Sequence, residues 1–318
     1  MKNLQVYLEN KKCFKLICGA GNKNLDEITR LCALYAAAGC RFFDLNASVE
    51  AIRAAKEGIK IAKKEECFIC VSVGTKNDPH LSKCKIDTTK CLSCGNCEDV
   101  CIQKAINKAS DSYIISEERC IGCGKCMEVC PVQAIERYSK EISFSEILPP
   151  LIKEDIDCIE YHTITDNEEE VMQGWKEITD IFDGVLSVCL DRSKLGNERL
   201  ASRLNSMKNV CSNIFMVQAD GAPMSGGSDD YRTTLQTVAT ADIVLKANIT
   251  PYVIMSGGTN SKTMELARQC GLDVCGFAVG SYARKIVKEY IEKEDFLNNN
   301  EIFNKALEIA KGLVNKAC

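Results

Sequence analysis

The chain has 318 residues, of which 46% are hydrophobic and 26% are charged, and its formal net charge is −4 at pH 7. This composition is typical of a soluble globular protein, and without a basic stripe interleaved with aromatic residues it gives no reason to expect nucleic-acid binding. No stretch approaches the roughly 18 apolar residues of a membrane span, and residues 1–15 lack a signal-peptide core. We therefore expect a cytoplasmic protein with no membrane span.

The chain before residue 84 predicts alternating strands and helices. Short apolar runs at 14–18, 41–45 and 67–73 are typical of buried strands. Apolar residues at helical spacing, preceded by Asn or Ser caps, predict helices at 24–39 and 48–64. This order indicates β/α units.

Eight cysteines then fall in two matching runs, each spaced C-x2-C-x2-C-x3-C. The runs are Cys91, Cys94, Cys97 and Cys101, and Cys120, Cys123, Cys126 and Cys130, the second closed by Pro131. Residues 85–106 align with 114–135 at a constant offset of 29 without a gap, so the region is an internal repeat.

This spacing is typical of a bacterial ferredoxin with two [4Fe–4S] clusters, in which the fourth cysteine of each run serves the other cluster. A tight loop can supply three thiolates to a cuboidal cluster, but the fourth must come from elsewhere in the chain. The predicted ligand sets are Cys91, Cys94, Cys97 and Cys130 for one cluster, and Cys120, Cys123, Cys126 and Cys101 for the other. Zinc, which usually takes four ligands per site, is the competing interpretation.

Most of the other thirteen cysteines, such as Cys32 and Cys158, lie within apolar runs, where cysteine is usually a small buried hydrophobe. Cys67 and Cys70 form a C-x2-C pair, but residues three apart in a strand point to opposite faces, so we do not expect a redox motif. So many thiols favour a reducing compartment.

After residue 140 the alternation resumes. Predicted strands are 158–162, 185–190, 213–217, 252–255 and 274–279; predicted helices are 144–155, 167–182, 194–209, 229–247, 260–270, 282–291 and a final 301–314. Pro149 and Pro150 are a potential break in the first of these helices.

Eight strands alternating with helices predict a (β/α)8 barrel of the TIM type, made of residues 1–83 and 141–318, with an open sheet as the alternative architecture. Residues 84–140 form a ferredoxin-like insertion between strand 3 and helix 3. Such an insertion lies on the C-terminal face, where barrel enzymes keep their active sites.

The turns after the last two predicted strands, 252–255 and 274–279, predict an anion site, because glycines let the backbone approach a phosphate closely. The candidate residues are Gly257, Gly258, Thr259, Gly280, Ser281 and Arg284. Flavin mononucleotide is the leading cofactor candidate, since its phosphate suits these turns and its ring can accept single electrons from a cluster. Ordinary glycine turns are the alternative.

Polar residues near the predicted strand ends include three catalytic candidates. His162 ends the fourth strand, Asp220 opens a glycine-rich loop at 218–228, and Lys15 lies in the first strand, where its side chain could point into the barrel. A structural role for His162 is an equal alternative.

Four segments together resemble the LdpA (light-dependent period) iron–sulfur family: 14–20, 220–226, 256–260 and 279–284. In photosynthetic bacteria that family is linked to redox input to the circadian clock. The resemblance implies cluster binding and redox sensing or electron transfer, and it supplies no catalytic residues.

The sequence leaves three functions open. In the first, the protein senses redox state or transfers electrons to a partner protein or small molecule, with the barrel as scaffold. In the second, an oxidoreductase passes electrons to a flavin or a phosphorylated small molecule at the barrel mouth. In the third, the clusters only brace the insertion.

Overall fold

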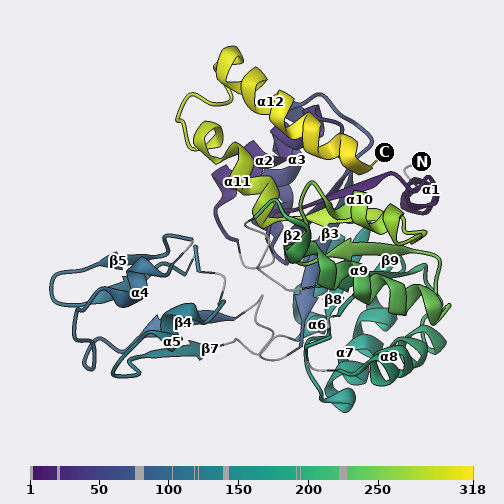
Figure 1. The fold of residues 1–318 in the computed structure, drawn as a ribbon, viewed down its shortest axis with the longest axis horizontal. Helices are drawn as coiled ribbons and strands as arrows, with labels where there is room; N and C mark the ends of the chain where they lie inside the picture. The colour runs from purple at the N-terminus through teal and green to yellow at the C-terminus, as the bar shows by residue number, and fades with distance from the viewer. Residues whose placement is uncertain are drawn as a thin grey trace.

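The computed structural model describes residues 3–19, 22–75, 82–101, 103–117, 119–120, 122–138, 143–190, 192–193, 195–221 and 228–317. Within them, eight parallel strands close into a barrel and follow chain order around it (Figure 1). The strands are β1 (Cys13–Ile17), β2 (Phe42–Asn46), β3 (Phe68–Gly74), β8 (Cys158–His162), β9 (Val185–Leu190), β10 (Phe215–Asp220), β11 (Val253–Ser256) and β12 (Gly276–Val279). Because β12 pairs with β1, placing Phe277 opposite Phe14, the predicted barrel is confirmed and the open sheet is wrong.

Helices surround the barrel as predicted. They are α2 (Leu25–Ala37), α3 (Val49–Ile61), α6 (Phe144–Ile152), α7 (Glu168–Ile181), α8 (Asn197–Asn209), α9 (Tyr231–Lys246), α10 (Thr263–Gln269) and α11 (Ser281–Ile291). A further helix, α12 (Asn300–Val314), packs against α2 and α11. The side chains of Asn24, Ser48 and Asn167 cap their helices by accepting a backbone N–H, which fixes where each helix begins.

Two features differ from the sequence-based expectation. Helix α6 runs through Pro149 and Pro150 without a break; both prolines are exposed, while Leu148 and Leu151 hold the opposite side of the helix in the core. A short helix, α1 (Leu4–Glu9), was not predicted.

Helix α1 closes the N-terminal end of the barrel. Leu4 and Leu8 are buried among the lowest interior side chains, and Tyr7 packs against Phe68 in a tilted arrangement with ring centroids 5.5 Å apart. This lowest layer is apolar; it includes Cys13, Phe42, Cys70, Cys158, Val185 and Met216. Access to the interior is therefore expected from the opposite, C-terminal end.

The insertion leaves the barrel after β3 and returns at α6. In its described residues, β4 (Lys83–Ile86) pairs with β7 (Ile135–Tyr138), and β5 (Ile106–Lys108) pairs with β6 (Tyr113–Ile115), both antiparallel. Two single-turn helices complete it: α4 (Asn96–Asp99) and α5 (Lys125–Glu128). The offset of 29 maps β4 onto β6, α4 onto α5 and β5 onto β7, so the sequence repeat is a structural repeat.

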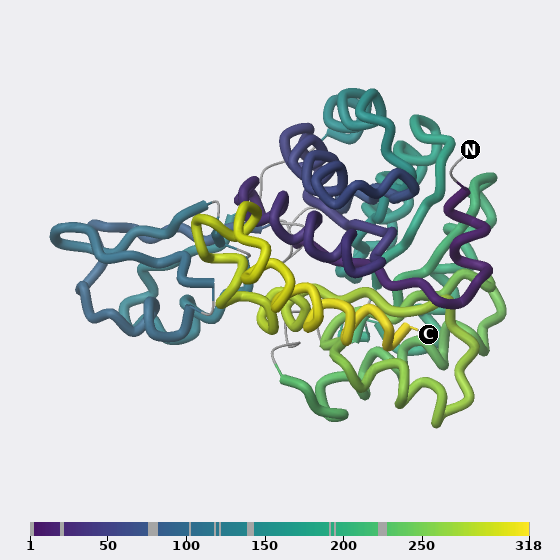
Figure 2. Tube along the Cα trace, turned by 90° about the horizontal axis from the view of Figure 1, so that it is seen from above, coloured from purple at the N-terminus to yellow at the C-terminus, as the bar shows by residue number. Residues whose placement is uncertain are grey.

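The insertion and α1 lie at opposite ends of the barrel, in both views (Figures 1 and 2). Because parallel strands all end at one face, an insertion after β3 stands on the C-terminal face. An ion pair joins the two parts, with Lys23 Nζ, from the loop after β1, 3.0 Å from Glu117 Oε1 in the insertion.

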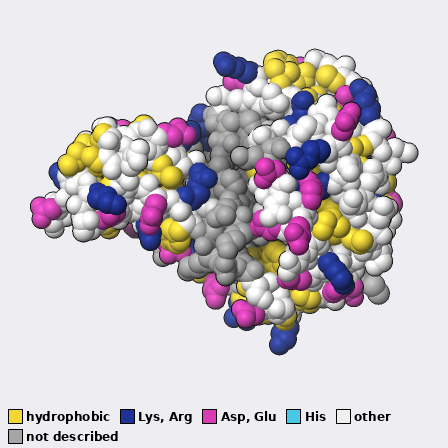
Figure 3. All heavy atoms as spheres, turned by 90° about the horizontal axis from the view of Figure 1, so that it is seen from below, with side chains coloured by type: hydrophobic (Ala, Val, Ile, Leu, Met, Phe, Trp, Pro, Cys, Tyr) yellow, Lys and Arg dark blue, Asp and Glu magenta, His cyan; other side chains and the backbone are white. Residues whose placement is uncertain are grey.

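On the face drawn in Figure 3, acidic and basic side chains of the described residues are interspersed over both parts. In the ranges that the structure describes, no helix combines the length and apolar character needed to cross a membrane.

Candidate iron–sulfur sites and the polar barrel interior

Within the described part of the insertion, cysteines line two small hollows. The first hollow is lined by Cys91, Cys94, Cys97 and Cys130, and the second by Cys101, Cys120, Cys123 and Cys126. Each hollow therefore takes three cysteines from one run and the fourth from the other, which is the grouping that crossed ligation requires.

The loops that carry these cysteines need left-handed backbone. Gly95 and Gly124, at equivalent repeat positions, have φ of 86° and 81° just before α4 and α5. Ser93 and Gly122, also equivalent, have φ of 53° and 62°. Three of these four positions are glycine, the residue that adopts this conformation without strain.

Backbone amides point at the cysteine sulfurs in both halves. The hydrogen bonds are Ser93 N to Cys91 Sγ (3.4 Å), Gly122 N to Cys120 Sγ (3.4 Å), Ala105 N to Cys101 Sγ (3.3 Å) and Ala134 N to Cys130 Sγ (3.2 Å). Amide donors favour the thiolate form, and hydrogen bonds to sulfur tune a cluster's reduction potential. With apolar neighbours such as Ile106 and Ile135, the residues present fit a [4Fe–4S] cluster at each hollow.

One cysteine at the second hollow was not singled out from the sequence. Cys84, in β4, also lines that hollow and is buried. Of the other cysteines outside the two runs that the structure describes, all but Cys270 are buried, as expected. Cys67 and Cys70 do face opposite ways, one toward the helices and the other into the barrel.

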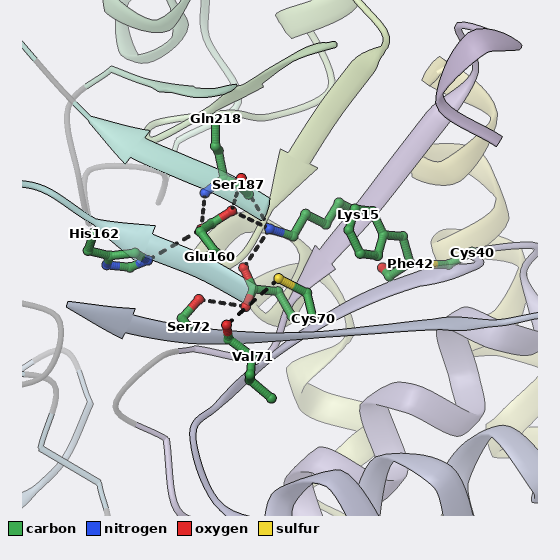
Figure 4. Close-up of polar contacts among 11 residues, drawn as sticks. Lys15, Cys40, Phe42, Cys70, Val71, Ser72, Glu160, His162, Ser187 and Gln218 are labelled. Carbon is green, nitrogen blue, oxygen red and sulfur yellow. Dashed lines mark hydrogen bonds and ion pairs between the residues drawn. The ribbon is translucent and has the colours of Figure 1, made fainter. Parts of the chain in front are cut away.

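The barrel interior above its apolar layer holds a buried ionic network (Figure 4). Lys15 Nζ lies 2.5 Å from Glu160 Oε2, 2.9 Å from Asp44 Oδ2 and 2.9 Å from Gln218 Oε1. Gln218 Nε2 donates to Glu160 Oε1 at 2.6 Å. The hydroxyl of Ser187 donates to Glu160 Oε2 at 3.1 Å. Barrel interiors are usually filled by branched apolar residues, so this charged layer departs from the usual packing.

Lys15 and Glu160 hold each other in the charged form, whereas the environment of Asp44 favours its neutral form. Burial acts to lower the pKa of Lys15, but the carboxylates of Asp44 and Glu160 outweigh it and hold that pKa well above its usual value. Burial acts to raise the pKa of Glu160, but Lys15 and His162 lower it to about 2. For Asp44, burial outweighs the attraction of Lys15 and raises the pKa. Lys15 is therefore an ammonium ion rather than a free amine nucleophile.

The catalytic candidates lie at different places relative to this network. Lys15 is at its centre, and His162, at the end of β8, has Nε2 3.3 Å from Glu160 Oε1. Asp220 is buried at the end of β10, one inward position above Gln218. The structure thus joins Lys15 and His162 through Glu160.

Two sets of side chains are close enough to share a metal ion: Glu160, His162 and Cys189, and Asp44, Cys70 and Glu160. Both sets include Glu160, whose oxygens already accept hydrogen bonds from Lys15, Ser187 and Gln218. The ammonium of Lys15 occupies the position between the carboxylates that a cation would take. We therefore assign this place to Lys15.

The predicted anion-site residues lie at the C-terminal ends of β11 and β12. Gly257 and Gly258 have φ of 70° and 79°. Gly280 directly precedes α11, whose first residue is Ser281. The hydroxyl of Thr259 donates to Ala278 O at 2.5 Å. Residues 222–227 of the predicted glycine-rich loop lie outside the described residues.

Arg284 has a structural role that the sequence did not predict. Its Nη2 donates to the carbonyl oxygen of Cys18 at 3.0 Å, and its Nε lies 3.2 Å from Glu27 Oε1. The side chain is 16% exposed, so it is not a solvated first-turn arginine. It holds the segment that follows β1, and its charge is already matched by Glu27.

Comparisons with known proteins match two separate regions of the chain to two families. The light dependent period A C-terminal domain family matches residues 150–316, and the 4Fe-4S binding domain family matches residues 113–136. The curated protein "Light dependent period A" of Synechococcus elongatus is 29% identical over 294 residues, which cover 88% of this chain and 82% of that protein.

Two solved barrel enzymes are also similar. A truncated 3-deoxy-D-arabino-heptulosonate 7-phosphate synthase from Thermotoga maritima has a TM-score of 0.48 at 8% identity, covering 95% of this chain and 86% of that one. The YdjI aldolase from Escherichia coli K12 has a TM-score of 0.49 at 7% identity, covering 99% of this chain and 93% of that one. Because the C-terminal domain family matches more than half of the chain, and a 4Fe-4S domain lies within the insertion, the protein is an iron–sulfur member of the light dependent period A family.

Proposed function

We propose that this protein is a redox protein carrying two [4Fe–4S] clusters, which transfers electrons or senses redox state through the insertion. One observation carries the proposal: each cysteine-lined hollow combines three cysteines of one run with the fourth of the other. A zinc site has no use for this crossing, since four thiolates close together in one run would suffice.

The two sites differ in their surroundings, which supports a direction for electron flow. At the first hollow Cys94 is exposed and Leu92 is 65% exposed, so a partner can approach. At the second hollow Lys83 donates to Cys120 O at 2.5 Å, and the nearby Glu117 pairs with Lys23 of the barrel. Electrons from a redox partner protein or a small-molecule donor would enter at the first cluster and leave toward the barrel from the second.

The test is anaerobic purification followed by iron and acid-labile sulfide analysis. Two cubanes predict about eight iron and about eight sulfide per chain. Stoichiometric zinc, or about four iron after full reconstitution, would refute the two-cluster proposal.

A second function is favoured by the buried ionic network: a cluster-fed oxidoreductase acting on a small molecule at the barrel mouth. A buried charged layer costs stability, and such costs are most often retained at functional sites. The turns at Gly257–Gly258 and Gly280–Ser281 would hold the phosphate of flavin mononucleotide or of a phosphorylated substrate through backbone N–H groups. A bound flavin would supply an acceptor of single electrons.

The chain's own residues supply proton chemistry for such a reaction. Glu160 fixes the His162 ring through the contact to Nε2, and Lys15 keeps Glu160 ionised. His162 is thereby positioned to hold or release a proton at the mouth end of the network. Asp220, which is buried at the end of β10, is a second carboxylate at the mouth end of the barrel interior.

Released-flavin analysis of anaerobic protein tests the second function. The oxidoreductase proposal loses its support if no flavin is released and if titrations with flavin mononucleotide and phosphorylated metabolites show no binding at Gly258 and Ser281. The two-cluster redox proposal would then stand alone.

A further inference from the structure

Five thiols, rather than four, surround the second hollow among the residues that the structure describes. Cys84 reaches it from β4 and is only 4% exposed. It lines this hollow together with Cys120 and Cys126, and its backbone N donates to Cys120 Sγ at 3.4 Å. A cysteine that served only as a small hydrophobe would have aliphatic neighbours, whereas Cys84 faces two candidate ligands.

The internal repeat provides a comparison. The offset of 29 places Tyr113 at the position of Cys84, and Tyr113 lines the first hollow in the same way. Both residues are buried in one apolar cluster with the ligand cysteines. The two halves therefore differ at this position: the first hollow has an aromatic side chain where the second has a fifth thiol.

We propose that Cys84 is a reserve ligand of the second cluster, able to take the iron position of Cys120; this inference rests on the two-cluster function proposed above. In the exchange, the Cys84 thiol loses its proton to solvent and its thiolate bonds to the iron. The bond from that iron to Cys120 breaks, and the Cys120 thiolate takes up a proton. No electron is gained or lost, so the exchange needs no oxidant or reductant.

The exchange is confined to one side of the cluster. Cys84 lines the hollow beside Cys120 and Cys126, and its backbone amide is already directed at the Cys120 sulfur. A thiolate is the form that binds iron, and a thiol held against the departing ligand has the shortest path to the vacated position. The first cluster has no equivalent, since its lining at that position is the phenol of Tyr113.

The test compares two equivalent ligands after anaerobic reconstitution. Cys120→Ala should retain about eight iron per chain, because Cys84 replaces the lost thiolate, whereas Cys91→Ala should fall to about four. Cys84→Ser alone should keep about eight, and Cys84→Ser/Cys120→Ala should fall to about four. The reverse variant introduces a fifth thiol at the first hollow and leaves the second hollow unchanged. Cys91→Ala/Tyr113→Cys should therefore hold more iron than Cys91→Ala.

Each outcome separates the reserve ligand from the two-cluster function. Wild-type protein with about eight iron, combined with a Cys120→Ala variant that drops to about four, would overturn the reserve role and leave two clusters intact. Loss of iron from Cys84→Ser alone would also overturn it, because Cys84 would then be a primary ligand. Wild-type protein with about four iron would instead refute the two-cluster function.

Discussion

Replacing Lys15 by Met should strongly destabilise the barrel, because it leaves two carboxylates buried without their cation. Lys15 is fully buried, and Nζ lies within 2.9 Å of both Asp44 and Glu160. Methionine fills a similar volume, so the change removes charge with little loss of packing. Breaking a buried ion pair from one side typically costs about 3–5 kcal/mol, and we expect Lys15→Met to fall in that range.

The control is an exposed ion pair of the same residue types. Lys176 Nζ lies 2.7 Å from Asp180 Oδ2 on the surface of α7, and both side chains are more than half exposed. Lys176→Met should therefore cost less than about 1 kcal/mol. A triple variant, Lys15→Met/Asp44→Asn/Glu160→Gln, removes every formal charge from the three groups, and it should be less destabilised than Lys15→Met alone.

Urea unfolding followed by tryptophan fluorescence measures these differences, since Trp175 is the single tryptophan and is fully buried where α7 packs against the barrel. The pH dependence gives an independent check. In the wild type, the lowered pKa of Glu160 contributes stability that is present above its usual value near 4.5 and lost as pH falls toward about 2. In Lys15→Met the lysine no longer opposes burial, so the pKa of Glu160 should rise. The loss of unfolding free energy relative to the wild type should therefore become smaller as pH falls from 7 to 4.

Two results would refute this reasoning. One is a Lys15→Met penalty no larger than that of Lys176→Met. The other is a penalty that grows as the pH falls, because protonation of the stranded carboxylates can only relieve the uncompensated charge.

Three further predictions concern the clusters, the mouth and the insertion. If the ligands are crossed, Cys130→Ala combined with Cys94→Ala should still hold about four iron, whereas Cys130→Ala combined with Cys123→Ala should hold almost none; the reverse pattern would indicate uncrossed ligands. Gly258→Asp should abolish flavin mononucleotide binding in a titration while leaving the iron content unchanged, because it adds a carboxylate and a Cβ at a residue with φ of 79°. Deleting residues 84–140 behind a short linker should leave a barrel with a cooperative Trp175 unfolding transition, since closing a loop costs little more as it lengthens; loss of that transition would contradict the two-domain organisation.

The fold was predictable because local signals agree with the tertiary structure over most of the chain. Strands β8 and β9 match their predicted ranges, 158–162 and 185–190. Strand β10 was predicted at 213–217 but spans Phe215–Asp220. Its last inward residues, Gln218 and Asp220, are polar, and a polar pattern in an isolated sequence is typical of a loop. They belong to the strand because both are buried and β10 stays paired with β11 as far as Asp220, which lies opposite Ser256.

The candidate sites likewise divide into features that the sequence predicts and features that only the folded structure reveals. The grouping of the eight cysteines follows from the short spacing within each run, and spacing is visible in the sequence. The bond between Lys15 and Glu160 joins residues 145 positions apart, and only the closure of the barrel brings them together. Cys84 was missed because it belongs to neither cysteine run. The signal that could have revealed it is the difference between the two repeats, which have Cys84 and Tyr113 at equivalent positions. The i, i+4 spacing of Leu4 and Leu8 could have revealed α1.

The crossed arrangement of the two hollows also sets an order of events during synthesis. Cys91, Cys94 and Cys97 are synthesised first, but their hollow lacks its fourth cysteine until Cys130 is added. Cys130 follows Cys101, the last cysteine of the first run, by 29 residues. At about 5–20 residues per second, that interval lasts on the order of seconds. By then the residues of β1 to β3 have already been synthesised. Under the crossed ligation proposed above, a cluster carrier that arrives before Cys130 would meet an incomplete ligand set.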